Sequence, residues 1–182
     1  MRPAAVLTDL DGTLLDHGGV LGEAARAAIC ELRQRGIPVV PLTSKTEVEL
    51  RDLLVKLDAG GIGSFENGAG VVGPGGVVVS EKAVPVAALT ARLGELAQLT
   101  GLPLTPAVAL PTAEVCRITG FSEDRIPAML ARGFGLPFLA PEGAAEVLGR
   151  IARRLPATRL TRGGQFWHLS GDHGKEDAVE LL

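Results

Sequence analysis

Cysteine is scarce in this sequence, which contains only Cys30 and Cys116 among its 182 residues. The two cysteines lie far apart and lack the close spacing that metal ligands usually have. Cys30 falls on the apolar side of a helical pattern, so we expect it to be a small core residue. A chain without a disulfide framework is typical of a reducing compartment, and we expect a cytoplasmic location.

Long apolar runs and clusters of positive charge are also missing from the sequence. No apolar run approaches the roughly 20 residues that a membrane-spanning helix needs. The 18 Lys and Arg residues are scattered and face 21 Asp and Glu residues, which gives a formal net charge of −3. This balance lacks the basic patch of a nucleic-acid-binding protein and the polybasic segment of a membrane-surface protein. We therefore expect neither kind of partner.

The first part of the sequence predicts alternating strands and helices. Short apolar runs bounded by turn residues are typical of buried parallel strands, and apolar residues at helical spacing indicate helices. Because this alternation favours a parallel sheet with right-handed crossovers, we expect an α/β core. The expected strands are residues 4–8, 37–42 and 61–65, and the expected helices are residues 22–35 and 47–57.

The middle of the sequence departs from this rhythm. Two valine runs around a Gly/Pro turn predict a hairpin over residues 71–79. We interpret the following segment as an α+β cap inserted into the core, with Leu89, Leu93, Leu96 and Leu99 on one face of its first helix. Further expected helices are residues 85–99, 122–132, 142–155 and 175–182, and further strands are residues 115–119, 138–139 and 165–169. The predicted division is a core over 1–79, a cap over 80–170 and a return to the core over 171–182.

Asp9 and Asp11 carry the strongest chemical signal. They follow the first expected strand, and open α/β sheets bind their ligands at the carboxyl ends of strands. One carboxylate can attack phosphorus, while the other protonates the leaving oxygen and then activates water. A Mg²⁺ ion would offset the repulsion between these carboxylates and a phosphate. The alternatives are a structural acidic turn and a calcium-binding loop. The calcium-binding loop is disfavoured, because Thr13 and Val20 stand at positions where it would need acidic residues.

Residues 9–16, Asp-Leu-Asp-Gly-Thr-Leu-Leu-Asp, resemble the first motif of the haloacid dehalogenase superfamily of aspartate-nucleophile phosphatases. The resemblance implies a Rossmann-like parallel sheet with an inserted cap, dependence on Mg²⁺ and an aspartyl-phosphate intermediate. It implies that Asp9 is the nucleophile and Asp11 the general acid/base. Thr43 matches the second-motif hydroxyl that binds the phosphoryl group, and Lys175 matches the third-motif lysine. The implied metal ligands are Asp9 and Asp11, the latter through its main-chain carbonyl.

Further segments resemble the mannosyl-3-phosphoglycerate phosphatases of that superfamily. These segments are Thr43-Ser44-Lys45-Thr46, Glu66-Asn67-Gly68-Ala69, and Phe166-Trp167-His168-Leu169 followed by Gly174-Lys175. The resemblance implies a small phosphorylated sugar acid, 2-mannosyl-3-phosphoglycerate, as the substrate and mannosylglycerate as the product. The candidate substrate-binding residues are Ser44, Lys45, Asn67 and His168, with Arg162 as an additional cation.

These candidate residues also have purely structural interpretations. Ser44 can cap a helix, Lys45 can be an exposed surface lysine, and Asn67 with the following glycine can form a simple turn. His168 lies in an apolar strand and can be a core histidine. The sequence leaves both interpretations open.

The sequence departs from the pattern of this branch at its end and in its cap. It ends at Leu182, before the acidic fourth motif that completes the Mg²⁺ site in the branch. A truncation, proteolysis and a short variant completed by a partner would each explain this end, and we favour truncation. A truncation would weaken metal binding and turnover and expose a sheet edge to association, with the oligomeric state open. Gln165 replaces a usual arginine, and residues 133–136 replace a more acidic segment. These changes bear on the substrate more than on the phosphatase chemistry.

The sequence supports two functional hypotheses. The first is a Mg²⁺-dependent phosphomonoesterase acting on 2-mannosyl-3-phosphoglycerate, or on another sugar phosphate within the same superfamily. The second is an inactive fragment that binds a phosphorylated ligand or a partner protein through the exposed edge.

Overall fold

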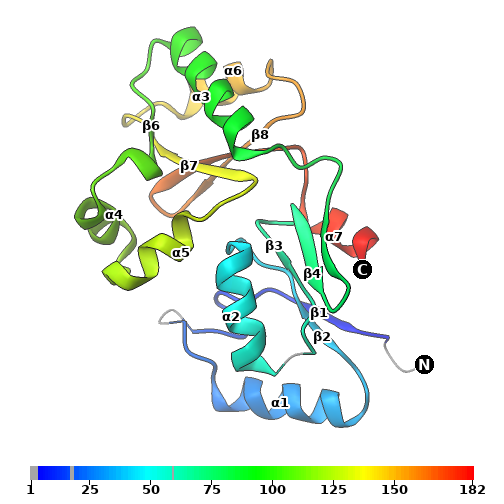
Figure 1. The fold of residues 1–182 in the computed structure, drawn as a ribbon. Coiled ribbons are helices and arrows are strands. Elements are labelled where there is room, and N and C mark those ends of the chain that lie inside the picture. Colours follow the sequence, from blue (N-terminus) through cyan, green and yellow to red (C-terminus); the bar gives the residue numbers. More distant parts are fainter. Residues whose placement is uncertain (1–3, 17–18, 59) are drawn as a thin grey trace. The chain divides into compact units, whose positions relative to one another are not determined.

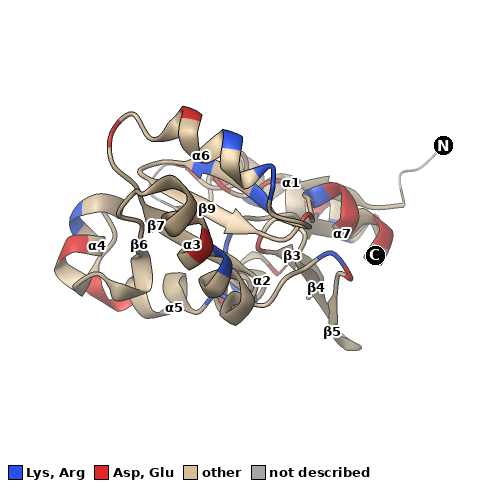
Figure 2. Ribbon diagram, turned by 90° about the horizontal axis from the view of Figure 1, so that it is seen from above, with Lys and Arg blue, Asp and Glu red and all other residues tan. Residues whose placement is uncertain are grey.

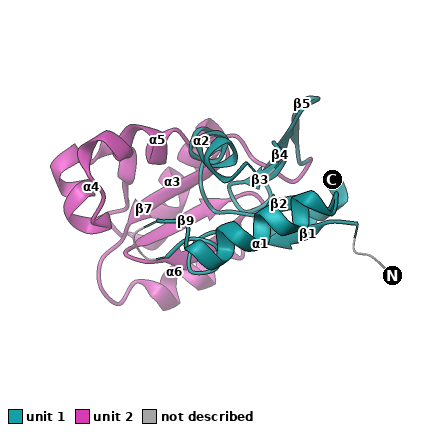
Figure 3. Ribbon diagram, turned by 90° about the horizontal axis from the view of Figure 1, so that it is seen from below, with its two compact units in different colours: residues 1–80, 174–182 teal, residues 81–173 magenta. Residues whose placement is uncertain are grey.

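The chain forms two compact units in the computed structural model, which describes residues 4–16, 19–58 and 60–182 (Figure 1). Unit 1 comprises residues 1–80 and 174–182, and unit 2 comprises residues 81–173 (Figure 3). Unit 2 is therefore inserted between two segments of unit 1. Unit 1 contains a two-stranded and a three-stranded sheet, unit 2 contains a four-stranded sheet, and each unit has its own cluster of buried apolar side chains.

Unit 1 is built on parallel strands whose spatial order follows the sequence. The strands are β1 (Val6–Thr8), β2 (Val39–Pro41) and β3 (Gly63–Phe65), and the helices between them are α1 (Glu23–Gln34) and α2 (Glu47–Leu57). Strand β1 pairs with β2 in parallel, and a parallel bridge between Leu42 and Ser64 joins β2 to β3. The predicted α/β core is confirmed, with strands that are shorter than expected.

An antiparallel hairpin extends the sheet of unit 1. Strand β4 (Gly70–Gly73) pairs with β3 on one side and with β5 (Gly76–Val79) on the other. This arrangement confirms the hairpin that the valine runs predicted. Strand β4 is largely buried, whereas every residue of β5 is exposed, as expected for an edge strand.

Helix α7 (Lys175–Leu181) brings the chain back to unit 1 after the insertion. Its Ala178 is fully buried in an apolar cluster with Val40, Leu42 and Val71. This packing holds α7 against strands β2 and β4, so the orientation of its first turn is set by the core of unit 1.

Unit 2 contains an antiparallel sheet with the strand order β6-β7-β9-β8. Its strands are β6 (Thr105–Pro106), β7 (Gly135–Leu139), β8 (Arg159–Gly163) and β9 (Phe166–Ser170). The expected strands at β7 and β9 are confirmed, although β7 contains Pro137 opposite His168. Strand β6 was not predicted, because it is only two residues long. Strand β8 was not predicted either, because Leu160 is its one apolar residue.

Two helices of unit 2 pack on one face of this sheet. The helices of the unit are α3 (Val86–Thr100), α4 (Thr112–Thr119), α5 (Ile126–Leu130) and α6 (Ala145–Ala152). Leu96 of α3 and Leu148 of α6 are fully buried with Phe138 and Leu169 of the sheet. The apolar spacing of α3 and α6 therefore forms the core of unit 2. The expected helix over residues 122–132 is replaced by a short 3₁₀ turn followed by α5.

The strand predicted over residues 115–119 is wrong, because this segment lies in α4. Its β-branched residues favour a strand only when a pleated surface is available to pack them. Val115 is instead buried against Ile126 and Met129 in a separate helical cluster. Gly120 then ends the helix in the left-handed conformation, which glycine adopts without strain.

Two side chains assigned to the interior are exposed. Leu99 is 56% exposed in the last turn of α3, and the thiol-bearing Cys30 is exposed on α1. Each helical residue turns by about 100°, so Leu99 lies about 80° around the helix from Leu89. Cys30 is one such step beyond the buried Ile29. Helix rotation therefore carries both side chains out of the buried stripe.

Positive and negative residues are interspersed along the helices (Figure 2). In α2, Arg51 Nη2 lies 2.8 Å from Glu47 Oε1, and Arg35 pairs with Glu31 at the end of α1. Exposed pairs one turn apart stabilise a helix by only about 0.3–0.5 kcal/mol. Among the described residues, no helix combines the length and the apolar character that crossing a membrane requires.

Replacing Phe138 with alanine tests the core assignment for unit 2. Phe138 is fully buried, so we expect Phe138→Ala to lower the free energy of unfolding of this unit by about 3–5 kcal/mol. Urea denaturation followed by the fluorescence of Trp167, the single tryptophan, measures the loss. The control Leu99→Ala, at an exposed position, should cost less than about 0.5 kcal/mol. Equal losses for the two variants would contradict the assignment.

Candidate active site

The first strand ends in a turn that is organised around Leu10. This residue is fully buried, and its carbonyl oxygen accepts hydrogen bonds from the main-chain N–H groups of Thr13, Leu14 and Leu15 at 3.2, 3.0 and 2.8 Å. The Leu10 N–H also donates to Asp9 Oδ1 at 2.7 Å. The turn therefore fixes the Asp9 carboxylate at the carboxyl end of β1.

The second strand leads into Thr43, which is fully buried. Its N–H donates to the Ser64 carbonyl at 3.1 Å, and its carbonyl accepts from the Asn67 N–H at 2.8 Å. Its hydroxyl oxygen accepts from the Lys45 N–H at 3.1 Å. These bonds tie the end of β2 to the end of β3, so the segments after the two strands form one hydrogen-bonded structure.

Helix α2 begins with a capping box formed by Thr46 and Glu49. The Thr46 hydroxyl accepts from the Glu49 N–H at 3.2 Å, and Glu49 Oε2 accepts from the Thr46 N–H at 2.9 Å. Such a pair satisfies two of the main-chain donors that a helix start leaves open. The structural interpretation of Ser44 as the cap is therefore wrong, and Ser44 lies exposed in the preceding turn.

The third strand ends in a loop whose backbone is left-handed at three successive residues. The φ angles are 45° at Glu66, 58° at Asn67 and 93° at Gly68. Residues other than glycine enter this region at a cost of roughly 1–3 kcal/mol, so surrounding contacts must hold them there. One such contact is the 2.8 Å hydrogen bond from the Glu66 N–H to the Lys45 carbonyl.

Each of the two aspartates is paired with its own lysine. Lys175 Nζ lies 2.9 Å from Asp9 Oδ2, and Lys45 Nζ lies 2.9 Å from Asp11 Oδ1. The Lys45 side chain is only 12% exposed, so its interpretation as an ordinary surface lysine is wrong. Partial burial strengthens such pairs, because less water screens them.

Direct backbone contact fixes the start of α7 beside the loop after β3. A Cβ atom placed on Gly68 would lie 1.9 Å from the carbonyl oxygen of Gly174, which is far inside van der Waals contact. The Gly174 N–H also donates to Asp177 Oδ2 at 2.6 Å within the first turn of the helix. The close approach and this cap set the position of Lys175, the residue that follows Gly174.

The structure brings the predicted residues of unit 1 together and places two others in unit 2. Asp9 meets Lys175 directly, and Asp11 is linked through Lys45 to the hydroxyl of Thr43. The exposed Ser44 and Asn67 belong to the same group of strand ends. Arg162 and His168 lie in β8 and β9 of unit 2.

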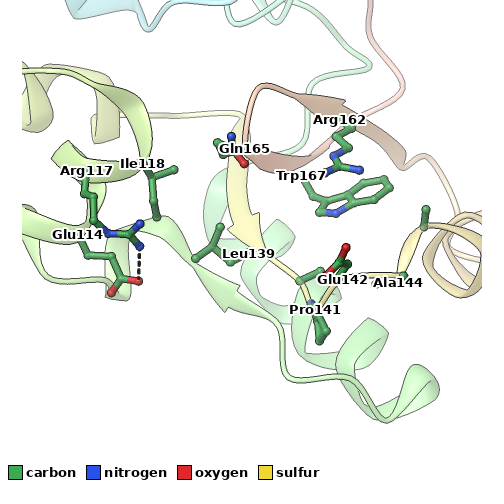
Figure 4. Close-up of a pocket in the computed structure, with 13 residues that line it drawn as sticks. Glu114, Arg117, Ile118, Leu139, Pro141, Glu142, Ala144, Arg162, Gln165 and Trp167 are labelled. Carbon is green, nitrogen blue, oxygen red and sulfur yellow. Dashed lines mark ion pairs between the residues drawn. The ribbon is translucent and has the colours of Figure 1, made fainter.

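Arg162 and His168 project from opposite faces of their sheet. The strand register pairs Arg162 with Trp167 and Thr161 with His168. Because successive strand residues alternate between faces, Arg162 shares a face with Trp167, and His168 lies on the other face. The Arg162 guanidinium is 5.6 Å from the centre of the indole ring (Figure 4). These two residues therefore do not contribute to a single face of unit 2.

His168 is held in its neutral form. Burial lowers the pKa of His168 from 6.5 to about 4, and the positive charge of Arg132 acts in the same direction. A hydrogen bond with the backbone of Gly163 acts in the opposite direction but is outweighed. At neutral pH the imidazole can therefore donate or accept a hydrogen bond without carrying charge.

The donor set at the end of β1 suits a magnesium ion. Mg²⁺ in proteins takes one or two carboxylates and completes its shell with waters and substrate phosphate oxygens. Asp9 and Asp11 supply two carboxylates within one turn. Over residues 4–16, 19–58 and 60–182, no group of three or more His, Cys, Asp and Glu residues could form an all-protein metal site. Asp9 and Asp11 therefore fit the ligand preference of a magnesium ion.

The positioning roles of Gly174 and Asp177 were not predicted from the sequence. An acid three residues after a small residue at a helix start is the spacing of a capping residue, and this signal could have identified Asp177. Gly68 precedes unit 2 in the sequence and Gly174 follows it, so no local sequence pattern predicts their contact.

Sequence comparisons relate the chain to known proteins. Residues 6–99 match the model of the haloacid dehalogenase-like hydrolase family. A glucosyl-3-phosphoglycerate/mannosyl-3-phosphoglycerate phosphatase from Methanococcoides burtonii is 28% identical over 193 residues, which cover 97% of this chain and 71% of that protein. A mannosyl-3-phosphoglycerate phosphatase from Aeropyrum pernix is 30% identical over 203 residues, covering 98% of this chain and 71% of that protein.

The fold also matches solved structures. A haloacid dehalogenase-like hydrolase from Bacteroides thetaiotaomicron superimposes with a TM-score of 0.72, over 100% of this chain and 76% of that chain. Its sequence is 16% identical, so this likeness concerns the fold alone.

Gly68→Ala tests the contact between the loop and α7. The new methyl group would strike the Gly174 carbonyl, so we expect unit 1 to lose about 2 kcal/mol or more of stability. Hydrogen-exchange mass spectrometry should then show faster exchange in the peptide that contains α7. The control Gly76→Ala has a φ of 110° but nothing within 4 Å of the added carbon, and it should leave α7 protected. Unchanged exchange in the first variant would refute the contact.

The lowered pKa of His168 predicts a pH dependence of stability. Between pH 6.5 and about 4 the unfolded chain binds a proton that the folded chain does not, so the folded state loses stability as the pH falls. The loss should level off below about pH 4, at up to roughly 3 kcal/mol. Urea denaturation at several pH values, followed by Trp167 fluorescence, measures the slope. His168→Gln should flatten it, and an unchanged slope would contradict the assignment.

Proposed function

Because the chain belongs to the haloacid dehalogenase-like hydrolases, as a phosphatase of the branch that contains the mannosyl-3-phosphoglycerate phosphatases, we propose that it hydrolyses phosphate monoesters through a phosphorylated Asp9. The observation that carries the proposal is the 2.9 Å ion pair between Asp9 Oδ2 and Lys175 Nζ. This ion pair supports a site in which a carboxylate at the end of β1 is held beside a cation from α7, the helix that follows unit 2 in the sequence.

Asp9 attacks the phosphorus atom in the proposed first step. The bond between phosphorus and the leaving oxygen breaks as the bond to the Asp9 oxygen forms, so the phosphoryl group moves to the protein. Asp11 donates a proton to the leaving oxygen and later removes one from the water that hydrolyses the intermediate. The pairing of Asp11 with Lys45 orients the carboxylate and favours its charged form, which supports the role of Asp11 as the base toward water.

Thr43 and Lys175 bind the phosphoryl group in this proposal. Lys175 offsets the negative charge of the phosphoryl group during its transfer to Asp9. The Thr43 hydroxyl donates a hydrogen bond to an oxygen of the phosphoryl group. The Asp9 carboxylate and the main-chain carbonyl of Asp11 would hold Mg²⁺, which supplies charge neutralisation when it is bound. Both groups are oxygen donors at the end of β1, and using the Asp11 carbonyl leaves the Asp11 carboxylate available for its acid/base role.

The proposed substrate is a 3-phosphoglycerate that carries a mannosyl or glucosyl group. The names of the relatives from Methanococcoides burtonii and Aeropyrum pernix support it. We assign unit 1 as the catalytic core and unit 2 as the cap, with Ser44, Lys45 and Asn67 as core contacts and His168 as a cap contact. Arg162 is the weakest member of this set, because its sheet face is opposite to that of His168. Both cysteines are free, in keeping with a cytoplasmic location.

Asp9→Asn tests the nucleophile. An amide cannot accept the phosphoryl group in the same way, so we expect turnover to fall by about 10³-fold or more. Phosphate release from mannosyl-3-phosphoglycerate in the presence of Mg²⁺ measures it. The control Asp52→Asn changes an exposed aspartate of α2 and should leave turnover unaltered.

Two outcomes of this assay would contradict the proposal. They are hydrolysis retained by Asp9→Asn and hydrolysis that persists unchanged when Mg²⁺ is chelated. Substrate binding without phosphate release, both by this chain and by one extended with any downstream coding sequence, would favour a binding protein that lacks catalytic activity.

A further inference from the structure

Unit 2 contains a pocket of about 590 Å³ at one end of its sheet (Figure 4). Its lining comes from β7, β8 and β9 and the turn between β8 and β9, from α4 and from the segment that leads into α6. The volume lies within the roughly 300–1,000 Å³ that is typical of small-molecule sites. All of its lining residues belong to unit 2, so the pocket shares no residue with the group formed by Asp9 and Lys175.

One wall of the pocket is an aromatic surface supported by the core. The strand register places Phe138, Trp167 and Arg162 side by side in one row across β7, β9 and β8. Phe138 is fully buried, and Trp167 is only partly buried against the same core cluster. The indole is thus fixed from behind by packing while part of it faces the pocket. A fixed aromatic ring of this kind offers a flat apolar surface to a ligand.

Hydrogen-bonding groups of both kinds line the pocket. Arg162 lies beside the indole, Gln165 and Glu142 also line the pocket, and Glu114 and Arg117 form an ion pair on the wall contributed by α4 (Figure 4). The lining thus contains two guanidinium groups and two carboxylates, and their formal charges balance. A balanced lining gives a singly charged ligand of either sign little net attraction, but it offers donors and acceptors together.

We propose that this pocket is an accessory binding site for an uncharged sugar, a hexopyranoside. One face of a pyranose ring carries C–H groups and suits the indole of Trp167, while its hydroxyl groups both donate and accept hydrogen bonds. Glu142 would accept from hydroxyls, Arg162 would donate to them, and Gln165 can do both. Arg162 is exposed, and its guanidinium lies 5.6 Å from the ring centre, so a sugar can take its place on the indole.

The single tryptophan makes the site directly observable. Because Trp167 is the only tryptophan in the chain, a change in intrinsic fluorescence reports on this pocket. Titration with methyl α-D-mannopyranoside should give a saturable change with a dissociation constant on the order of 1 mM. The choice of a mannoside rests on the proposed function. The titration is therefore repeated in Asp9→Asn, which should bind the sugar equally well even though turnover is lost.

Matched variants separate binding in the pocket from indirect effects. Arg162→Ala and Gln165→Ala alter exposed residues that line the pocket, and each should weaken binding at least tenfold. The control Arg125→Ala removes another arginine that lies over an aromatic ring, 4.0 Å from the centre of Phe121, but it is outside this pocket and should leave binding unchanged.

The proposal fails if the fluorescence of the unmodified chain does not saturate with the mannoside. It also fails if Arg162→Ala and Gln165→Ala bind as tightly as Arg125→Ala. Hydrolysis by the unmodified chain is measured in parallel, so an absent accessory site and an incorrect catalytic assignment give different results.

Discussion

The ion pair between Asp9 and Lys175 joins the end of the first strand to the start of the last helix. Everything that we assign to the candidate active site depends on this meeting, because the lysine reaches the carboxylate only when both segments of unit 1 are packed together. Ala178 provides the packing, since its burial among Val40, Leu42 and Val71 fixes the helix that carries Lys175. A buried alanine is thus as important for the site as the charged residues themselves.

Backbone geometry defines the site as much as side-chain charge does. Three strand ends meet there, and the last of them continues through the left-handed residues Glu66, Asn67 and Gly68. That conformation is unfavourable for the first two, yet it directs their N–H groups to the carbonyls of Lys45 and Thr43. The hydrogen bonds gained in this way offset the strain and hold the candidate phosphate-binding residue Thr43 and its neighbour Lys45 in position.

Much of this arrangement could be predicted from local patterns. The acidic turn after β1, the start of α2 at Glu47 and the helix that begins at Lys175 all follow from short signals in the sequence. The parts that could not be predicted depend on contacts between distant segments. The pairing of Lys45 with Asp11 and the burial that turns residues 115–119 into a helix are both decided by tertiary packing.

The contact between Gly68 and Gly174 has a consequence for how this architecture can vary. The contact joins a residue that precedes unit 2 in the sequence to a residue that follows it. The length of unit 2 can therefore change without altering the geometry of the strand ends in unit 1. Closing a flexible loop of twice the length costs only about 0.6 kcal/mol more. Insertions in the loops between the helices and strands of unit 2 should therefore be tolerated far better than a single added methyl group at the junction.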